Sequence, residues 1–346
     1  MKIVGALSIK GAAAWLPDTT QTADEAIAAG LLTAEYAKRI GIEAVTVAED
    51  TMGAPDMAVL AGRRAIEDAN IDPALIGLVT HSWLFYQGHD LWSPAHYVAD
   101  GVGASSATAF GIHQMSNGGP TAVQLGAINL MADPDAHYTL ATSGDRFCLP
   151  AINRWGVDSD CALGDGGGAL VLGRSDGETD RLRLLSVGTA TAPEFEGLCR
   201  GDDVWSPHPL WHRMPIDGTR LKTAFCASID VEQFVLAVRK KLAESVQQAL
   251  DHAGIENRDP RIRIAVVPRI GRGLLERAFQ PALRDTVRAE IVHLGGRTGH
   301  LGAGDLFANI TDIIELNLLE PGEIAIIASS GGSCSWSCVV VQQPAG

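Results

Sequence analysis

The chain has 346 residues, of which 46% are hydrophobic and 20% charged, so it can bury a large core and is not a disordered protein. A net charge of -14 disfavours nucleic acid and anionic membrane surfaces as partners. No apolar run is long enough to predict a membrane span. The 6 cysteines lack CxxC spacing and predict no zinc site. We therefore expect a cytoplasmic protein with reduced thiols and no bound metal.

Helices and short apolar strands alternate from the start of the chain. The first segment, MKIVGALSIKGAAAWLP, predicts a strand rather than a cleaved leader. Apolar residues at helical spacing predict a helix over 55–72, and the apolar run IGLVTHSW that follows predicts a buried strand. The segment 116–145 predicts a Gly-rich helix start, a helix and another strand. This pattern is typical of an α/β fold with a largely parallel sheet.

The same order of elements returns in the second half of the chain. Residues 241–271 repeat helix, Asp-Pro turn and strand, and residues 300–332 match 116–145, both ending in a strand that closes on Ser-Gly. The repeat favours internal duplication into halves of residues 1–178 and 179–346 with pseudo-twofold symmetry. Such symmetry would bring residue 116 beside residue 300. Coincidental similarity between two ordinary α/β segments is the alternative.

Two aromatic segments with little periodicity, 82–97 and 194–219, are expected to cover a ligand site. Aromatic packing at a dimer interface is the alternative. The aromatic residues that we assign to substrate binding are Trp83, Phe85, Trp92 and Trp205. His81, just before the first segment, and His89 and His96 within it have irregular spacing and do not predict a metal site.

Three motifs resemble those of the ketoacyl-ACP synthase III family, and they occur in that family's order. They are PDMAVLAGRRAIEDANID (55–72), GDGGGALVLG (164–173) and SSGGSCSWSCVVV (329–341). With the duplication, the resemblance spans essentially the whole chain. It implies the thiolase fold, an α/β architecture with duplicated βα halves in a five-layer α-β-α-β-α arrangement and pseudo-twofold symmetry. It also implies a homodimer.

The resemblance places Ser116, in GIHQMSNGGP (111–120), where that family carries its nucleophilic cysteine. A helix N-terminus suits a nucleophile because its unpaired N–H groups and positive dipole end stabilise a developing oxyanion. A capping role is the alternative for Ser116, since serine is a favoured N-cap. By resemblance, the backbone N–H groups of Ser116 and Gly332 would form the oxyanion hole.

A serine hydroxyl needs an adjacent base, because it is almost un-ionised at neutral pH. His300 and Asp305 lie in GHLGAGD, the segment that the duplication brings opposite Ser116. We therefore predict a triad of Ser116, His300 and Asp305, with His300 before a helix and Asp305 in its first turn. The alternatives are an unlinked polar residue for His300 and a helix cap for Asp305.

Two departures from the family bear on the reaction. In segments that resemble VVPRIGR (266–272) and GGRTG (295–299), the family uses a histidine and an asparagine to stabilise the enolate of a malonyl thioester. This chain has Arg269 and Arg297 there, which we assign to substrate binding. Neither arginine reproduces the compact neutral donor pair, so carbon-carbon bond formation is in doubt.

The sequence thus predicts an acyltransferase of secondary metabolism with a ping-pong mechanism. An acyl or aryl group would pass from a thioester donor through acyl-Ser116 to a hydroxyl, amine or carrier thiol. The resemblance implies no permanently bound cofactor. The donor would be coenzyme A or the phosphopantetheine of a partner, either an acyl carrier protein or a polyketide synthase carrier domain, and a small molecule would be the acceptor. The alternatives are a decarboxylating condensing enzyme that loads a starter unit, and a non-catalytic thiolase-fold partner subunit.

Overall fold

The computed structural model describes residues 1–209, 211–332 and 334–345, and its largest element is one 10-stranded sheet. Its strands, in the order in which they lie side by side, are β10 (Glu290–Val292), β9 (Ile262–Val266), β11 (Ile324–Gly331), β12 (Ser335–Gln342), β8 (Leu182–Thr191), β1 (Lys2–Trp15), β7 (Gly166–Arg174), β6 (Tyr138–Asp145), β4 (Ile76–Ser82) and β5 (Thr108–Ile112).

The strand order is the same on both sides of the β1–β8 pair. Outward from β1 the strands are β7, β6, β4 and β5, and outward from β8 they are β12, β11, β9 and β10. Each strand of the first half therefore has a counterpart at the same place in the second half. The polar stretch between β7 and β8 contains the predicted boundary between residues 178 and 179, and that division into two domains stays a prediction.

The expectation of a largely parallel sheet is wrong. Only the outer strands pair in parallel, β4 with β5 and β6 and β9 with β10 and β11, whereas the inner pairings are antiparallel. The physical reason is the connection: β11 reaches β12, and β6 reaches β7, without a crossover helix. A parallel pair needs such a crossover, so these strands return antiparallel.

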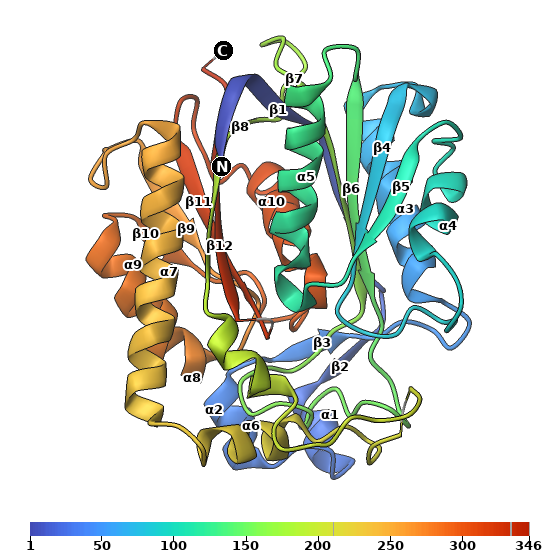
Figure 1. Cartoon of the computed structure of the whole chain (residues 1–346), viewed down its shortest axis with the longest axis vertical. Helices are drawn as coiled ribbons and strands as arrows, with labels where there is room; N and C mark the ends of the chain where they lie inside the picture. Colours follow the sequence, from blue (N-terminus) through green and yellow to red (C-terminus); the bar gives the residue numbers. More distant parts are fainter. Residues whose placement is uncertain (210, 333, 346) are drawn as a thin grey trace.

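Helices lie outside and between the two halves of the sheet, which gives the expected five layers (Figure 1). The outer helices of the first half are α3 (Ala54–Ala69) and α4 (Pro94–Gly101). The two helices between the halves are α5 (Gly118–Ala132) and α10 (Asp305–Glu315). The outer helical segments of the second half are α7 (Val231–Ala253), the π-helical η4 (Leu275–Phe279) and α9 (Gln280–Thr286).

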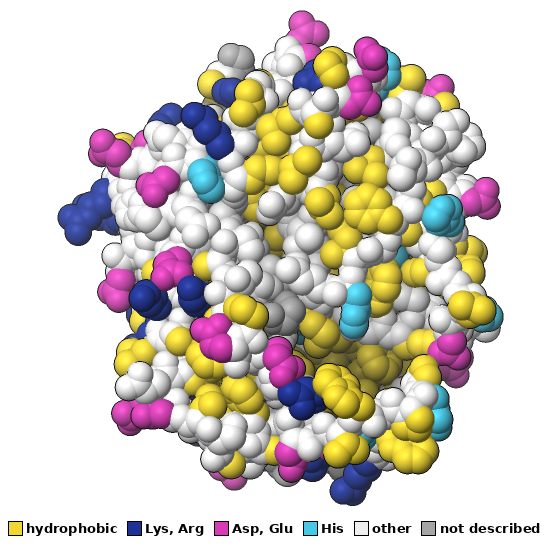
Figure 2. Space-filling view, viewed as in Figure 1, with side chains coloured by type: hydrophobic (Ala, Val, Ile, Leu, Met, Phe, Trp, Pro, Cys, Tyr) yellow, Lys and Arg dark blue, Asp and Glu magenta, His cyan; other side chains and the backbone are white. Residues whose placement is uncertain are grey.

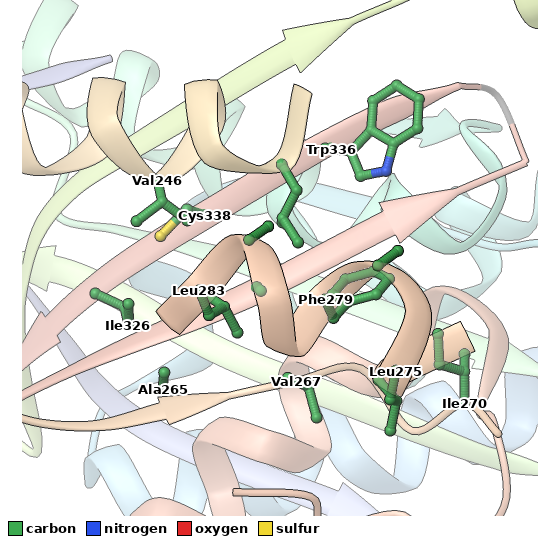
Figure 3. Close-up of a cluster of buried hydrophobic side chains, with 14 of the residues drawn as sticks. Val246, Ala265, Val267, Ile270, Leu275, Phe279, Leu283, Ile326, Trp336 and Cys338 are labelled. Carbon is green, nitrogen blue, oxygen red and sulfur yellow. The ribbon is translucent and has the colours of Figure 1, made fainter. Parts of the chain in front are cut away.

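Three apolar clusters hold these layers together. The inner cluster joins α5 and α10 to strands of both halves, and includes Val123, Leu172, Phe307 and Ile327. Burial of such side chains stabilises the fold by about 1.5–3 kcal/mol each. The outer cluster of the second half packs η4 and α9 on β9, β11 and α7 (Figure 3). Since both halves contribute to the inner cluster, they are packed as one body around α5 and α10.

The remaining elements gather below the sheet in Figure 1. They are the small sheet of β2 (Thr20–Thr22) and β3 (Ala44–Thr46), helices α1 (Ala23–Ala28), α2 (Ala34–Ile40), α6 (Gly218–Cys226) and α8 (Arg272–Leu274), and the 3-10 turns η2 (Met115–Asn117), η3 (Pro193–Cys199) and η5 (Gly302–Gly304). A further 3-10 turn, η1 (Pro73–Leu75), leads into the start of β4. In the ranges that the structure describes, no helix combines the length and apolarity that crossing a membrane needs.

Two equivalent glycines set the distance between the sheet and its outer helices. A Cβ at Gly11 of β1 would overlap the Ala65 carbonyl oxygen of α3, and a Cβ at Gly188 of β8 would overlap the Ser245 carbonyl oxygen of α7. We predict that Gly11→Ala and Gly188→Ala each lower the free energy of unfolding by about 1–3 kcal/mol, because overpacking pushes the helix outward. Chemical denaturation measures this effect.

The matched control is Gly77→Ala on β4, where an added Cβ has no heavy atom within 4 Å. This variant should unfold like the wild type. Equal stability of all three variants would contradict the close approach of α3 and α7 to the sheet.

Candidate active site

A cavity of about 1360 Å³ lies between the lower end of the sheet and the elements below it. Figure 2 shows its mouth as a hollow with apolar side chains below the centre of the view. Both aromatic segments predicted to cover a ligand site contribute to its wall, together with α6, α7 and η4. Ser116 and His300 both line this cavity.

Ser116 lies in the single turn η2, between the end of β5 and the start of α5. Met115 before it has a positive φ of 51°, so the chain turns sharply at the serine. A Cβ at Gly118 would press on Ser82 of β4, and a Cβ at Gly119 would press on the Ala303 carbonyl oxygen of the other half. These glycines therefore let the start of α5 approach both β4 and η5. The Ser116 Oγ lies 2.7 Å from the His300 Nε2. Its hydroxyl therefore has a base within hydrogen-bond distance, and no capping bond from it is needed to explain its place.

The backbone of His300 is bound to the first half of the chain. Its N–H donates to the Ala162 carbonyl at 2.8 Å, and its carbonyl accepts from the Gly164 N–H at 2.9 Å. A Cβ at Gly164 would overlap the Thr298 carbonyl oxygen, so only glycine permits this pairing. These two hydrogen bonds hold the backbone of His300 beside the segment just before β7. His300 lies before η5, as the sequence predicts.

Asp305, the first residue of α10, orients the imidazole. Its Oδ2 lies 2.7 Å from the His300 Nδ1 and accepts from the Arg269 N–H at 2.8 Å. Its Oδ1 accepts from the Leu301 N–H at 2.8 Å. Because Nδ1 donates to this carboxylate, the neutral imidazole presents an unprotonated Nε2 to the Ser116 hydroxyl.

The two buried groups shift each other's pKa. Burial alone would lower the pKa of His300, but the charge and hydrogen bond of Asp305 outweigh it and leave the pKa raised. Burial alone would raise the pKa of Asp305, but the His300 charge and the hydrogen bond from His300 keep it lowered. The pair therefore favours a carboxylate next to an imidazole of enhanced basicity.

Comparisons with known proteins identify the family of this chain. A beta-ketoacyl-acyl-carrier-protein synthase III from Roseiflexus castenholzii is 28% identical over 309 residues, which cover 89% of each chain. The corresponding enzyme of Ehrlichia canis is 30% identical over 218 residues, which cover 58% of this chain and 67% of the relative. This chain belongs to the ketoacyl-ACP synthase III-like proteins of the thiolase superfamily. It is therefore an acyl-transferring or condensing enzyme of that superfamily.

Among solved structures, the protein named ChlB3 acyltransferase has a TM-score of 0.89 and 27% identity, covering 98% of this chain and 99% of its own. This structural similarity confirms the predicted thiolase fold. No protein-family model matches the chain.

The C-terminal glycine loop of this synthase III-like protein packs on the turn η2 that carries Ser116. Gly331 packs so tightly on the backbone of Asn117 that a Cβ there would lie 2.7 Å from the Asn117 nitrogen. Gly332 follows beside Met115 and lines the cavity with Ser116. The two predicted oxyanion donors therefore lie on segments that touch each other.

Three of the four predicted aromatic residues line the cavity, namely Trp83, Phe85 and Trp92. Trp83 is stacked between two histidine rings at 5.7 and 5.8 Å. Trp205 is not among the described residues that line the cavity. It is 85% exposed and stacks on Arg200, so its predicted assignment to substrate binding is not supported.

Arg269 does not reach the cavity either. Its side chain is 1% exposed and binds Asn309 at 2.9 Å, Thr298 at 3.1 Å and the Asp312 carboxylate. The guanidinium is thus fully engaged within the protein. The predicted substrate-binding role of Arg269 is therefore corrected to a structural one. Its side-chain contacts fix the position of its backbone N–H, which donates a hydrogen bond to Asp305.

Arg297 is exposed and faces Glu43 at 3.6 Å, at the surface and outside the described cavity wall.

Sequence reasoning missed a charged cluster that does line the cavity. In it, Lys222 of α6 binds Asp158 at 2.6 Å and Asp160 at 3.3 Å. The alternation of Asp and Ser in VDSDC was the available signal.

The contrast between the two arginines gives a stability test. We predict that Arg269→Met lowers the free energy of unfolding by about 3 kcal/mol, because it leaves Asp312 and Asn309 without their buried partner. Arg297→Met should change it by less than about 0.5 kcal/mol, since surface pairs contribute little. Urea denaturation of both variants measures the difference, and equal values would contradict the buried network.

Proposed function

We propose that this protein is a serine-dependent acyltransferase with a ping-pong mechanism. The observation that carries the proposal is the chain of two hydrogen bonds from the Ser116 Oγ through His300 to Asp305, each 2.7 Å long. That arrangement is the one that activates a serine hydroxyl as a nucleophile. A cysteine thiol can ionise without such help, so a base placed against a serine supports an active site that has adapted to the hydroxyl.

In the first step, the Ser116 Oγ attacks the carbonyl carbon of an acyl thioester while its proton moves to the His300 Nε2. The negative charge on the carbonyl oxygen is held by the backbone N–H groups of Ser116 and Gly332. The carbon-sulfur bond then breaks, and the leaving thiolate takes the proton from His300. The products are a free thiol and an ester on Ser116.

In the second step, an acceptor hydroxyl, amine or thiol attacks this ester. Its proton moves to the His300 Nε2 as the new bond forms, and the same proton passes to the departing Ser116 oxygen. Asp305 keeps the imidazole oriented throughout and stabilises its charged form. Serine and imidazole return to their starting state, which completes the cycle.

The apolar wall with Trp83, Phe85 and Trp92 supports an apolar or aryl acyl group. The donor in this proposal is a thioester of coenzyme A or of a carrier protein, and the setting is secondary metabolism.

The similarity to a protein named as an acyltransferase supports transfer. The relatives named as synthases favour the rival reaction, a decarboxylating condensation. Against that rival, Arg269 is fully engaged inside the protein and Arg297 lies at the surface, so neither supports an enolate in the cavity.

Acyl-enzyme formation tests the proposal. We expect intact mass spectrometry to show one added acyl group after incubation with a panel of apolar and aryl thioesters. The adduct should be absent in Ser116→Ala. It should persist in Ser186→Ala, which removes a buried hydroxyl that binds the Ala249 carbonyl at 2.6 Å outside the site. Labelling of Ser116→Ala would contradict the proposal, and carbon dioxide release from a malonyl thioester would favour the condensing enzyme.

The acylation rate should also depend on pH through His300. Only the neutral imidazole accepts a proton, so the rate should fall as pH drops through the raised pKa of His300, above its usual 6.5. Asp305→Asn removes the charge that raises this pKa, so the acidic limb should move to lower pH while the maximal rate falls. Stopped-flow acylation across pH measures the acidic limb and the maximal rate. An identical acidic limb in the two proteins would contradict the role of the pair.

A further inference from the structure

A second carboxylate lies close to the triad, and the mechanism above gives it no role. Asp145 ends strand β6 and is fully buried. Its Oδ1 accepts from the N–H groups of Leu84 and Phe85, both at 2.9 Å. Its Oδ2 accepts from the Leu84 N–H at 2.9 Å and from the Ala303 N–H at 3.1 Å. The Asp145 carboxylate thus accepts hydrogen bonds from three backbone amides.

These amides belong to two segments that are remote in sequence. Leu84 and Phe85 form part of the cavity wall, whereas Ala303 lies in η5, between His300 and Asp305. The carboxylate occupies the place where a Cβ of Gly302 would lie, and Gly302 has a positive φ of 61°. The turn that carries His300 therefore packs directly on Asp145. A residue larger than glycine at position 302 would clash with that carboxylate.

The wall segment is fastened to the same strand end by a second contact. The Gln87 side-chain amide donates to the Gly144 carbonyl at 2.9 Å and to the Phe85 carbonyl at 3.2 Å. Its oxygen lies 3.0 Å from the Nε2 of the buried His81. The end of β6 is consequently a fixed anchor for the cavity wall, and Asp145 extends that anchor to the base.

We infer that Asp145 is a positioning residue that holds the His300 turn against Ser116 and couples it to the cavity wall around Phe85. This inference rests on the proposed function. Asp145 acts through backbone amides and does not touch the reacting atoms. A displaced wall would move Ala303, and with it the imidazole, relative to the serine hydroxyl. Catalysis is sensitive to such shifts, since a misplacement of about 1 Å can lower a rate about 100-fold.

The charge of Asp145 acts on His300 as well. Three carboxylates raise the pKa of His300: Asp305 on α10, Asp145 on β6 and Asp158 on the segment before β7. Burial raises the pKa of Asp145 itself to about 7, although its backbone hydrogen bonds and the His300 charge oppose this rise. Removing the charge at residue 145 should therefore lower the pKa of His300.

The test is Asp145→Asn, which keeps the shape but turns one acceptor oxygen into a donor that faces backbone N–H groups. We expect acylation by a thioester to slow by about 10- to 100-fold. The acidic limb of its pH profile should move to lower pH. Asp145→Glu retains the charge but displaces the amides, so it should slow acylation with the acidic limb unchanged.

The matched control is Asp180→Asn, a carboxylate whose side chain is 1% exposed and which binds Lys10 and Ser8 away from the cavity. It should lose stability but keep the wild-type acylation rate and acidic limb. If Asp145→Asn and Asp145→Glu both acylate at the wild-type rate, or if their only effect is the loss of stability seen in Asp180→Asn, the inference is wrong.

A measurement without substrate separates this inference from the proposed function. NMR titration of the His300 imidazole in the resting protein should give a lower pKa in Asp145→Asn than in the wild type. If no thioester acylates the wild type but the His300 pKa still shifts, the proposed function fails and the coupling stands. If the wild type is acylated and the His300 pKa does not shift, the coupling alone is wrong.

Discussion

The hydrogen bond between the Ser116 Oγ and the His300 Nε2 is the interaction on which the site depends, and it joins residues 184 positions apart. It exists because the two halves of the sheet close around α5 and α10, whose first turns meet at the same place. Glycines at 118, 119 and 164 remove the side chains that would keep these segments apart. The arrangement of Ser116 and His300 is thus a direct product of the repeated architecture.

Buried polar groups around that hydrogen bond fix the orientation of the His300 imidazole. Asp305 accepts from the backbone of Arg269 and Leu301, and Arg269 is held in turn by Asn309 and Asp312. The His300 charge and these hydrogen bonds keep the pKa of the buried Asp305 lowered, and the hydrogen bonds fix the direction of its carboxylate. The imidazole between Asp305 and the serine is therefore constrained from both sides, as a general base needs to be.

Much of this site could be predicted from the sequence because the repeat carries spatial information. Matching 116–145 with 300–332 was enough to bring Ser116 and His300 together, and the spacing between His300 and Asp305 placed Asp305 in the first turn of the helix. The roles of Arg269 and Trp205 could not be predicted, because burial is decided by tertiary packing rather than by residue type. Asp145 was missed although it ends a buried strand, a place where a charged residue requires partners that local sequence does not reveal. The largely parallel sheet was mispredicted because strand direction depends on connections between elements.

Peptide mapping of the acylated protein tests the central claim most directly. Trypsin should release residues 65–146 as one peptide, which contains Ser116 and no cysteine, since all 6 cysteines lie after residue 146. After a single turnover with an acyl thioester, we expect the added mass on this peptide, localised to Ser116 by fragmentation. Acyl groups found instead on a cysteine-containing peptide, as thioesters that neutral hydroxylamine cleaves, would contradict a serine nucleophile.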